Sequence, residues 1–267
     1  MKNTTYIIAF LIIAVVVIFF LNKKGLLPDN PLQISELPTK RPSDMIIEVS
    51  KGGGMLPISK SLYISKDSCY QRHWAYRVEN KTYFTLSDAE LDELYKAFVD
   101  NKFDLLKTYH SQTYDRGGTS VYLRINRKTY KINDSGGTYL RKYSLDNFKN
   151  ILNKVYNLVA TKTTALKQDF DIHLEQSIID LSISGHISSS TADYSKGFKK
   201  GETFVNKVSL KLVPGKHHFR ISFTTKDTLP NGKTYLGEAF KLDIDKTTKG
   251  INISQDSSNT LKFEYIR

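Results

Sequence analysis

Hydrophobic and polar positions follow three different patterns along the chain, and the first is an unbroken apolar run at residues 6–21. An asparagine and two lysines follow it. As a helix with a rise of about 1.5 Å per residue, the run spans about 24 Å, slightly less than a hydrocarbon core of about 30 Å. Two threonines before it can extend the helix, and the lysines after it can reach the headgroups. The pattern predicts a membrane anchor over residues 1–24 that contacts the bilayer through residues 6–21.

The residues after the apolar run favour retention of the anchor over its removal. Signal peptidase requires small residues in an A-x-A-like pattern, and residues 19–25 offer no such pattern. Lys2 and the amino terminus on one side balance Lys23 and Lys24 on the other, so charge does not decide the orientation. Because the head is short, we expect a signal-anchor with the bulk of the chain outside the cytoplasm. A domain tethered to the inner face of the membrane stays the alternative.

The second pattern mixes strand-like and helix-like segments. It begins after residues 25–44, where four prolines and little apolar periodicity predict a semi-extended spacer. Short strands are predicted at residues 45–49 and 62–65, and a further strand or hairpin at residues 76–85 with its turn at residues 79–81. A sheet is therefore expected to start directly after the spacer.

Two helices are predicted within this second pattern. Ser87 and Glu90 form an S-x-x-E capping box, and Ser144 is a suitable N-cap for the other helix. Between the helices, alternating apolar residues predict strands at residues 121–125 and 130–132, joined by a turn at residues 126–128. The apolar stripes of the two helices are Leu91, Leu94, Tyr95, Phe98 and Val99, and Phe148, Ile151, Leu152, Val155, Tyr156 and Val159. Residues 45–160 are thus predicted to be an α+β module, a small antiparallel sheet covered by two helices.

Residues 62–159 resemble an uncharacterised module of bacterial envelope proteins, especially of the Bacteroidetes type. The resemblance rests on the run SLYISKDSCY, the helix LSDAELDELYKAFVDNKFDLL, the segment DRGGTSVYLRINRKTYKINDSGG and a closing helix. In such modules a strand pair precedes a helix with a serine, two variable residues, glutamate and leucine, and an aspartate lies before the next strand. The resemblance implies an envelope location and no particular activity.

The third pattern has a period of two and occupies residues 173–267, after a predicted linker at residues 161–172. Apolar residues alternate in five segments, and Pro-Gly and Pro-Asn-Gly turns separate some of them. The alternating residues include Ile179, Leu181 and Ile183; Val208, Leu210 and Leu212; Phe219, Ile221 and Phe223; Phe240, Leu242 and Ile244; and Leu261, Phe263 and Tyr265. Short strands with regular turns predict an all-β, immunoglobulin-like sandwich.

Composition limits the class of protein further. The chain has 267 residues, is 40% hydrophobic and contains one cysteine, so its folded parts can bury real cores without an internal disulfide. Its net charge of +12 is concentrated before residue 169, since residues 25–168 hold 22 basic and 15 acidic side chains. The basic surplus therefore belongs to the first half of the chain.

Two segments share the pattern D-x-G-G-T and flank the predicted hairpin. They begin at Asp115 and Asp134, and their glycines are Gly117, Gly118, Gly136 and Gly137. A hairpin would bring both loops to the same end of the sheet, where two carboxylates and backbone amides could bind a cation or a polar ligand. Alternatively, the loops are two glycine-rich turns whose aspartates bond to their own backbone.

Basic and aromatic residues interleave in the same region. The basic residues are Arg124, Arg127, Lys128, Lys131, Arg141 and Lys142, and the aromatic residues are Tyr122, Tyr130, Tyr139 and Tyr143. Such interleaving is used by nucleic-acid surfaces, but a domain outside the cytoplasm meets anionic lipid or envelope polymer first. The hypothesis is an anion-binding patch, and the alternative is a solvated strand face.

Other candidate chemistry is weak. Cys69 and His73 lie four residues apart without an identifiable orienting group, and His217 and His218 are neighbours in a strand, so they point to opposite faces. Motifs for nucleotide binding, zinc proteases and serine hydrolases do not occur. We therefore expect no catalytic residue, cofactor or metal, and a membrane-anchored envelope protein that binds or scaffolds an envelope polymer or another envelope protein rather than nucleic acid. The alternative is an envelope enzyme that uses Asp115 and Asp134 as acid and base or as cation ligands.

Overall fold

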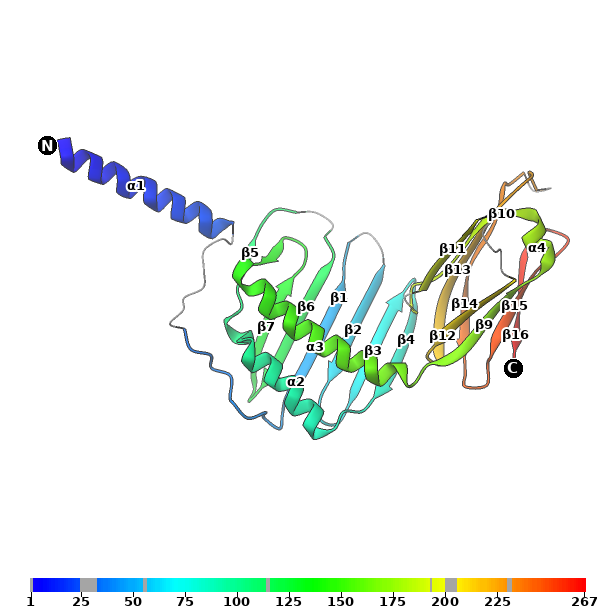
Figure 1. Ribbon diagram of the computed structural model, residues 1–267, viewed down its shortest axis with the longest axis horizontal. Helices are drawn as coiled ribbons and strands as arrows, with labels where there is room; N and C mark the ends of the chain where they lie inside the picture. The colour runs from blue at the N-terminus through cyan, green and yellow to red at the C-terminus, as the bar shows by residue number, and fades with distance from the viewer. Residues whose placement is uncertain are drawn as a thin grey trace. The chain divides into compact units, whose positions relative to one another are not determined.

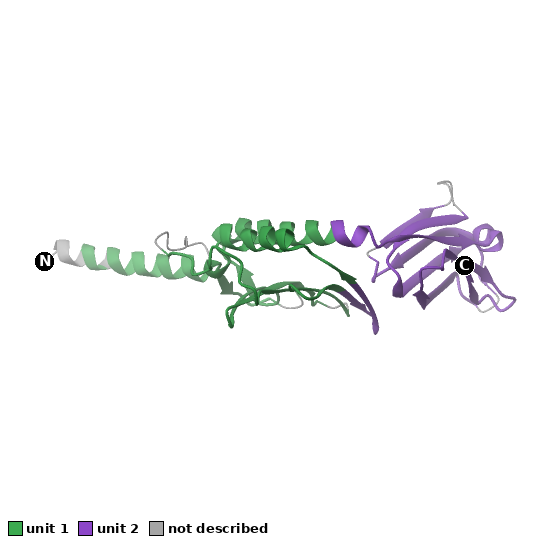
Figure 2. Ribbon diagram, turned by 90° about the horizontal axis from the view of Figure 1, so that it is seen from below, with its two compact units in different colours: residues 1–71, 83–160 green, residues 72–82, 161–267 purple. Residues whose placement is uncertain are grey.

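The computed structural model describes residues 2–24, 33–54, 57–113, 116–192, 194–199, 206–229 and 232–267. The fold mixes helix and sheet, with strands in the majority and few helices. It forms two compact units, coloured separately in Figure 2. Unit 1 consists of residues 1–71 and 83–160, and unit 2 consists of residues 72–82 and 161–267.

The apolar run forms helix α1 (Lys2–Lys23). Within it, Tyr6–Lys23 is long and apolar enough to cross a membrane. Its large apolar side chains are exposed around the whole helix, including Phe10 and Phe19. A helix that is apolar on all sides has no polar face for water, and this property agrees with the predicted membrane anchor.

A six-stranded sheet follows, in the order β4-β3-β2-β1-β6-β7. Strand β1 pairs antiparallel with both β2 and β6, and β6 pairs antiparallel with β7. A two-stranded sheet joins β5 to β8. The strands are β1 (Ile46–Gly52), β2 (Ile58–Ile64), β3 (Cys69–Ala75), β4 (Val78–Phe84), β5 (Thr108–His110), β6 (Gly118–Ile125), β7 (Lys128–Asp134) and β8 (Thr138–Leu140).

Two helices, α2 (Asp88–Asp100) and α3 (Leu145–Thr164), cover one face of this sheet (Figure 1). Short 3-10 turns, η1 (Phe103–Leu105) and η2 (Lys142–Ser144), follow α2 and precede α3. The core of unit 1 combines the predicted helix stripes with the inward residues of the strands. The strand contribution includes Ile47, Val49, Leu62, Ile64, Val121, Leu123, Ile125 and Ile132.

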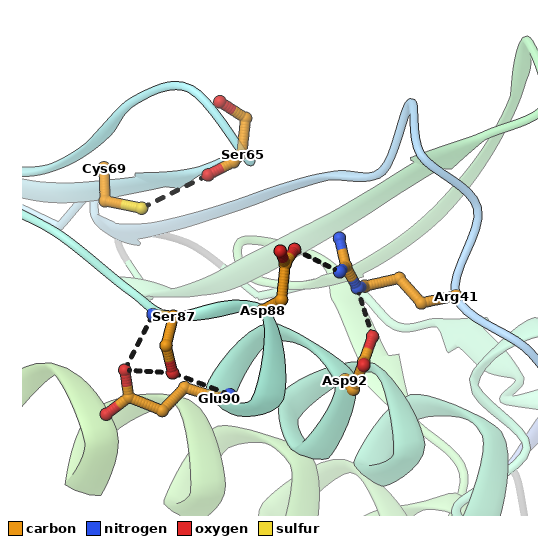
Figure 3. A network of polar contacts seen from close by, with 7 residues as sticks. All are labelled: Arg41, Ser65, Cys69, Ser87, Asp88, Glu90 and Asp92. Carbon is orange, nitrogen blue, oxygen red and sulfur yellow. Dashed lines mark hydrogen bonds and ion pairs between the residues drawn. The ribbon is translucent and has the colours of Figure 1, made fainter.

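The capping box at the start of α2 is confirmed. The Ser87 hydroxyl accepts a hydrogen bond from the Glu90 backbone N–H, and the Glu90 carboxylate accepts one from the Ser87 backbone N–H at 2.9 Å (Figure 3). Ser144 lies in η2 directly before α3, and its hydroxyl accepts a hydrogen bond from the backbone N–H of the distant residue Lys107 at 3.0 Å. The local sequence therefore sets where α2 begins, whereas the predicted N-cap role of Ser144 in α3 stays a prediction.

The turn of the β3–β4 hairpin lies elsewhere than predicted. Tyr76 and Arg77 form it with φ angles of 50° and 64°, whereas the expected turn residue Asn80 lies within β4 and is buried. Left-handed backbone at two successive residues is typical of a two-residue hairpin turn. The sequence did not reveal this turn, because neither of its residues is the Gly or Asn that usually adopts this conformation. Asn126 and Arg127, at the predicted turn between β6 and β7, adopt the same two conformations.

The described second half of the predicted spacer, residues 33–44, packs against unit 1. Leu37 is buried in the core, and Asp104 accepts hydrogen bonds from the Ser35 hydroxyl and the Glu36 N–H, each at 2.7 Å. The Tyr95 hydroxyl donates to the Pro38 carbonyl at 2.8 Å, and burial raises the pKa of Tyr95 to about 12. Proline did prevent regular structure here, but side-chain contacts fasten the segment, which we call the strap, to α2 and η1.

Arg41 links the strap to α2. Its guanidinium donates to Asp88 at 2.7 Å and to Asp92 at 2.5 Å, and its side chain is only 10% exposed (Figure 3). The hydrogen bond that Arg41 donates to Asp92, and then the one it donates to Asp88, raise the pKa of Arg41 against the opposing effect of burial. The two acidic residues also lie in the first turns of α2, where negative charge is favourable.

Unit 2 contains two four-stranded sheets with the orders β11-β10-β13-β14 and β12-β9-β15-β16. Strands of both sheets contribute to one core, which includes Phe170, Phe219 and Ile251. The bounds are β9 (Gln168–Leu174), α4 (Gln176–Leu181), β10 (Ser182–Ser189), β11 (Tyr194–Lys199), β12 (Lys207–Leu212), β13 (Gly215–Thr225), β14 (Tyr235–Ile244), β15 (Gly250–Gln255) and β16 (Leu261–Ile266). Of the predicted linker at residues 161–172, the first four residues belong to α3, and the last five begin β9.

The immunoglobulin-like assignment of unit 2 is not confirmed. In immunoglobulin domains the second and third strands lie in opposite sheets. Here β10 and β11, the second and third strands after residue 161, pair antiparallel in the same sheet, and β9 pairs parallel with β15. Period-two alternation predicted β12, β13, β14 and β16 correctly because it reports burial of one face. It was wrong at Ile179 and Leu181, which lie in helix α4, and it contains no information on which strands become neighbours.

A buried histidine forms a polar cluster in unit 2. His217 is fully buried, and its Nε2 lies 2.8 Å from the Val213 carbonyl oxygen. Its Nδ1 lies 3.2 Å from the Thr191 hydroxyl, and the Asn80 amide lies 3.1 Å from Nε2. Burial lowers the pKa of His217, against smaller opposing effects of the Val213 carbonyl and Asp243.

Replacing Arg41 with Ala should destabilise unit 1 by about 1 kcal/mol, because two ion pairs are lost whose acidic partners are mostly exposed and screened by water. Urea unfolding of the two proteins measures this difference. The matched control is Lys96→Ala, which removes an exposed pair with Asp100 and should cost about 0.3 kcal/mol. Equal losses in the two variants would show that the strap contributes nothing beyond an ordinary surface pair.

The stability of unit 2 should fall as the pH drops below about 6.5. The unfolded chain then protonates His217 while the folded unit, with its lowered pKa, does not, so the unfolded state binds more protons. The slope approaches about 1.4 kcal/mol per pH unit for one such group. Urea unfolding between about pH 5 and 8 should show a reduced slope of stability against pH in His217→Gln. An unchanged slope in His217→Gln would contradict the prediction.

Candidate functional site

The two D-x-G-G-T segments meet at one end of the unit 1 sheet, as the hairpin predicted. Thr119 of β6 pairs with Asp134 of β7, so the loop before β6 and the loop after β7 are neighbours. Asp115, the first aspartate of the pair, lies outside the described residues. The structure therefore tests the arrangement around Asp134 only.

Arg116 joins the two loops. Its guanidinium donates to the Asp134 carboxylate at 2.5 Å, to the Thr138 carbonyl at 2.7 Å and to the Gly136 carbonyl at 3.3 Å. The same guanidinium lies over the Tyr139 ring, 4.0 Å from its centroid. Because the Asp134 carboxylate already has a cationic partner, the geometry favours two turns that bond to each other over a cation site.

The glycines of these loops are explained by close backbone contacts. A Cβ on Gly118 would lie 1.9 Å from the Asp134 carbonyl oxygen, and one on Gly117 would lie 3.0 Å from that of Gly53. A Cβ on Gly137 would lie 2.7 Å from the His110 ring, and Gly136 has a φ of 56°. These positions need glycine for the fold itself, so the repeated G-G does not by itself indicate a ligand.

The residues of the predicted basic patch lie in several different parts of unit 1. Arg124 lies 3.8 Å from Glu48, and the Lys131 ammonium lies 4.9 Å above the Tyr122 ring. Lys128 pairs with Glu36 of the strap at 3.4 Å. Arg127 is in the β6–β7 turn, Arg141 and Lys142 precede α3, and Tyr130 packs against the core on the opposite face from Tyr122. The six cations thus do not form one continuous surface in the described structure.

Cys69 is a core residue rather than an activated nucleophile. It is 5% exposed, its thiol donates to the Ser65 carbonyl at 3.4 Å, and burial raises its pKa (Figure 3). A catalytic thiol instead needs a lowered pKa. Among the described residues, no group of three or more His, Cys, Asp or Glu side chains is placed to hold a metal ion.

The uncovered face of the unit 1 sheet carries a row of tyrosines that the sequence patterns did not reveal. The Tyr63 and Tyr70 rings stack with centroids 5.2 Å apart, and the Tyr83 ring lies 5.9 Å from that of Tyr70. Across β1 the row continues, because Glu48 pairs with both Tyr63 and Tyr122, and Tyr122 pairs with Lys131. We call these six residues, Tyr83, Tyr70, Tyr63, Glu48, Tyr122 and Lys131, the tyrosine face.

A second row of polar side chains runs beside the tyrosines. Ser50 pairs with both Ser61 and Ser120, and Ser120 pairs with Asn133. The Ser120 hydroxyl donates to the Asn133 side-chain oxygen at 2.5 Å. Directly opposed residues project from the same side of a sheet, so both rows share the face opposite the helices. In Figure 2, α3 runs along one side of this sheet, and no helix or strand of the described unit 1 covers the other.

Comparisons with known proteins give no relative for this chain. No family model, curated protein or solved structure matches it.

Replacing Arg116 with Ala should destabilise unit 1 by about 2 kcal/mol, because three charge-assisted hydrogen bonds are lost and Asp134, 26% exposed, loses its cation. Arg116→Lys should recover only part of this loss, since an ammonium cannot reproduce the planar geometry of the guanidinium. Urea unfolding measures both variants, with Lys142→Ala at an exposed position as the control. Stability equal to that of the unchanged protein in Arg116→Ala would show that the loops hold together without the ion pair.

Proposed function

We propose that the chain is a single-pass membrane protein that presents its two units on one side of a bilayer and acts there by binding. The observation that carries the proposal is α1, in which Tyr6–Lys23 is long and apolar enough to span a membrane. Burying such a helix in lipid removes its exposed apolar side chains from water and keeps its backbone hydrogen-bonded. Placement of the bulk outside the cytoplasm, in a cell envelope, is part of the proposal.

The tyrosine face supports binding as the mode of action. Glu48 and Lys131 are exposed, and Tyr83 is 60% exposed, so a partner can reach both ends and the middle of the row. Aromatic side chains on a rigid sheet supply contact area at a low entropic cost. A binding protein needs such a surface and no catalytic group, and an envelope polymer or another envelope protein is the partner class that the proposed location offers.

The competing proposal, an envelope enzyme using Asp115 and Asp134, has less support. Catalysis by an acid and a base requires two groups with different proton affinities that face a common substrate. Asp134 instead accepts a hydrogen bond from Arg116, whose guanidinium also bonds to two backbone carbonyls. No observation on the described residues favours the enzyme.

Membrane fractionation tests the anchor. The full chain should stay in the membrane pellet after extraction with alkaline carbonate. Ile12→Asp combined with Val16→Asp should move it to the supernatant, because each charge at the centre of a spanning helix costs about 2.5 to 3.5 kcal/mol on insertion scales. Ile12→Leu combined with Val16→Leu is the matched control and should stay in the pellet.

Protease treatment of intact and permeabilised cells then tests the side of the membrane. Digestion of the two units in cells whose outer barrier alone is opened would support the extracytoplasmic placement. Digestion only after the inner membrane is permeabilised would contradict it. Recovery of the full chain in the carbonate supernatant would contradict the anchor itself.

A further inference from the structure

The strap leaves only a short connection between α1 and the folded body of unit 1. Residues 33–44 lie in the predicted spacer, but they pack against unit 1, where Leu37 is buried in the core. Residues 25–32 are therefore what connects α1 to the strap, and eight residues span at most about 30 Å. A bilayer that holds α1 is consequently always within reach of unit 1.

Arg141, the residue before η2, contacts the last turn of α1. Its guanidinium donates a hydrogen bond to the side-chain oxygen of Asn22 at 2.8 Å, next to Lys23 and Lys24 in the sequence. Its Nε has no hydrogen-bond partner among the residues that the structure describes. The contact with Asn22 places η2 beside the end of the apolar run, which is the level of the headgroups when α1 spans a bilayer.

Cations outnumber acidic side chains around this contact. Lys23, Lys24 and Lys142 are exposed, and Arg141 is half-buried. The acidic residue nearest to η2 in the sequence is Asp146, so four cations are opposed by one carboxylate along these two segments. Lys and Arg side chains close to an anionic membrane surface are each attracted to it, and salt weakens that attraction.

The η2 segment is held in place by the fold and ends in an exposed aromatic ring. The Arg141 N–H donates to the Lys107 carbonyl at 2.9 Å, and the Lys107 N–H donates to the Ser144 hydroxyl at 3.0 Å. Between these two attachments lies Tyr143, which is 53% exposed. Tyrosine is enriched where membranes meet water, because its ring is apolar and its hydroxyl is polar.

We infer that the η2 segment binds the headgroups of anionic phospholipids, with Arg141 and Lys142 on the phosphates and Tyr143 at the interface. The inference rests on the membrane anchor proposed above and holds for either side of the bilayer. Lipid is the occupant because α1 and the short connection keep headgroups at a high effective concentration beside η2, so that individually weak contacts suffice. Of the six cations in the predicted anion-binding patch, it retains Arg141 and Lys142.

Lysine acetylation in lipid nanodiscs tests the inference on the full chain. One set of discs contains phosphatidylcholine alone, and the other contains phosphatidylcholine mixed with phosphatidylglycerol. The measured quantity is the acetylation rate of Lys142 relative to that of Lys66, which is exposed in the turn between β2 and β3. An ammonium bound to a phosphate reacts slowly, so the ratio should fall about fivefold in the anionic discs and recover in high salt.

Matched variants separate lipid binding from folding. Arg141→Gln removes one of the two phosphate contacts and should restore at least half of the Lys142 reactivity in anionic discs. Lys51→Gln removes the same charge from an exposed position of β1 and should leave the protection of Lys142 unchanged. Asn22→Ala should also weaken the protection, and because it lies in α1 it keeps the test decisive if Arg141→Gln fails to fold.

Three results would overturn the inference. One is a Lys142 rate that is equal in the two kinds of disc. Another is protection that is equally strong in phosphatidylcholine alone and insensitive to salt, and the third is protection that Arg141→Gln and Asn22→Ala both leave unchanged. None of these affects the carbonate extraction, so failure of the lipid inference and failure of the membrane anchor can be told apart.

Discussion

The antiparallel pairing of β1 with β6 is the constraint on which the rest of unit 1 depends. It joins segments about seventy residues apart in the sequence and sets Val49 against Val121 on the helix side and Glu48 against Tyr122 on the other side. A slip by one residue would exchange the two faces, burying the polar row and exposing the core. Helices α2 and α3 stabilise this register, because they cover the side of the sheet that carries Ile47 and Leu123.

Sequence patterns predicted the parts of this arrangement that depend on neighbours along the chain. The capping box involves only four successive residues, Ser87 to Glu90, and the alternation of Val121, Leu123 and Ile125 reports one buried face. Both features could therefore be predicted from the sequence. The packing of the strap against α2 could not be predicted, because Arg41 contacts Asp88 and Asp92 only after α2 has folded. Proline content indicates that the backbone is restricted, but it does not indicate what the segment packs against. The turn at Tyr76 and Arg77 lacked the usual Gly or Asn and was missed for that reason.

The candidate sites divide in the same way. That the two D-x-G-G-T loops lie at one end of the sheet followed from the hairpin alone, but the role of Arg116 between them required coordinates, because its three acceptors lie 18 to 22 residues away. The tyrosine face was harder still. Tyr70, Tyr63 and Tyr122 come to lie in one row only through the order and register of four strands, and neither the order nor the register is encoded in any one segment. Surfaces built across a sheet are therefore the features that sequence patterns miss most readily.

An open sheet face must satisfy two requirements at once, and tyrosine meets both. Its ring favours extended backbone and packs against a cross-strand partner, while its hydroxyl keeps the surface wettable. Charges interspersed along the row, Glu48 in the middle and Lys131 on the edge strand β7, oppose the stacking of two such faces between copies of the chain. Aliphatic residues would satisfy the packing but would leave an aggregation-prone patch. A face of this composition therefore stays wettable although no helix or strand of the described unit 1 covers it.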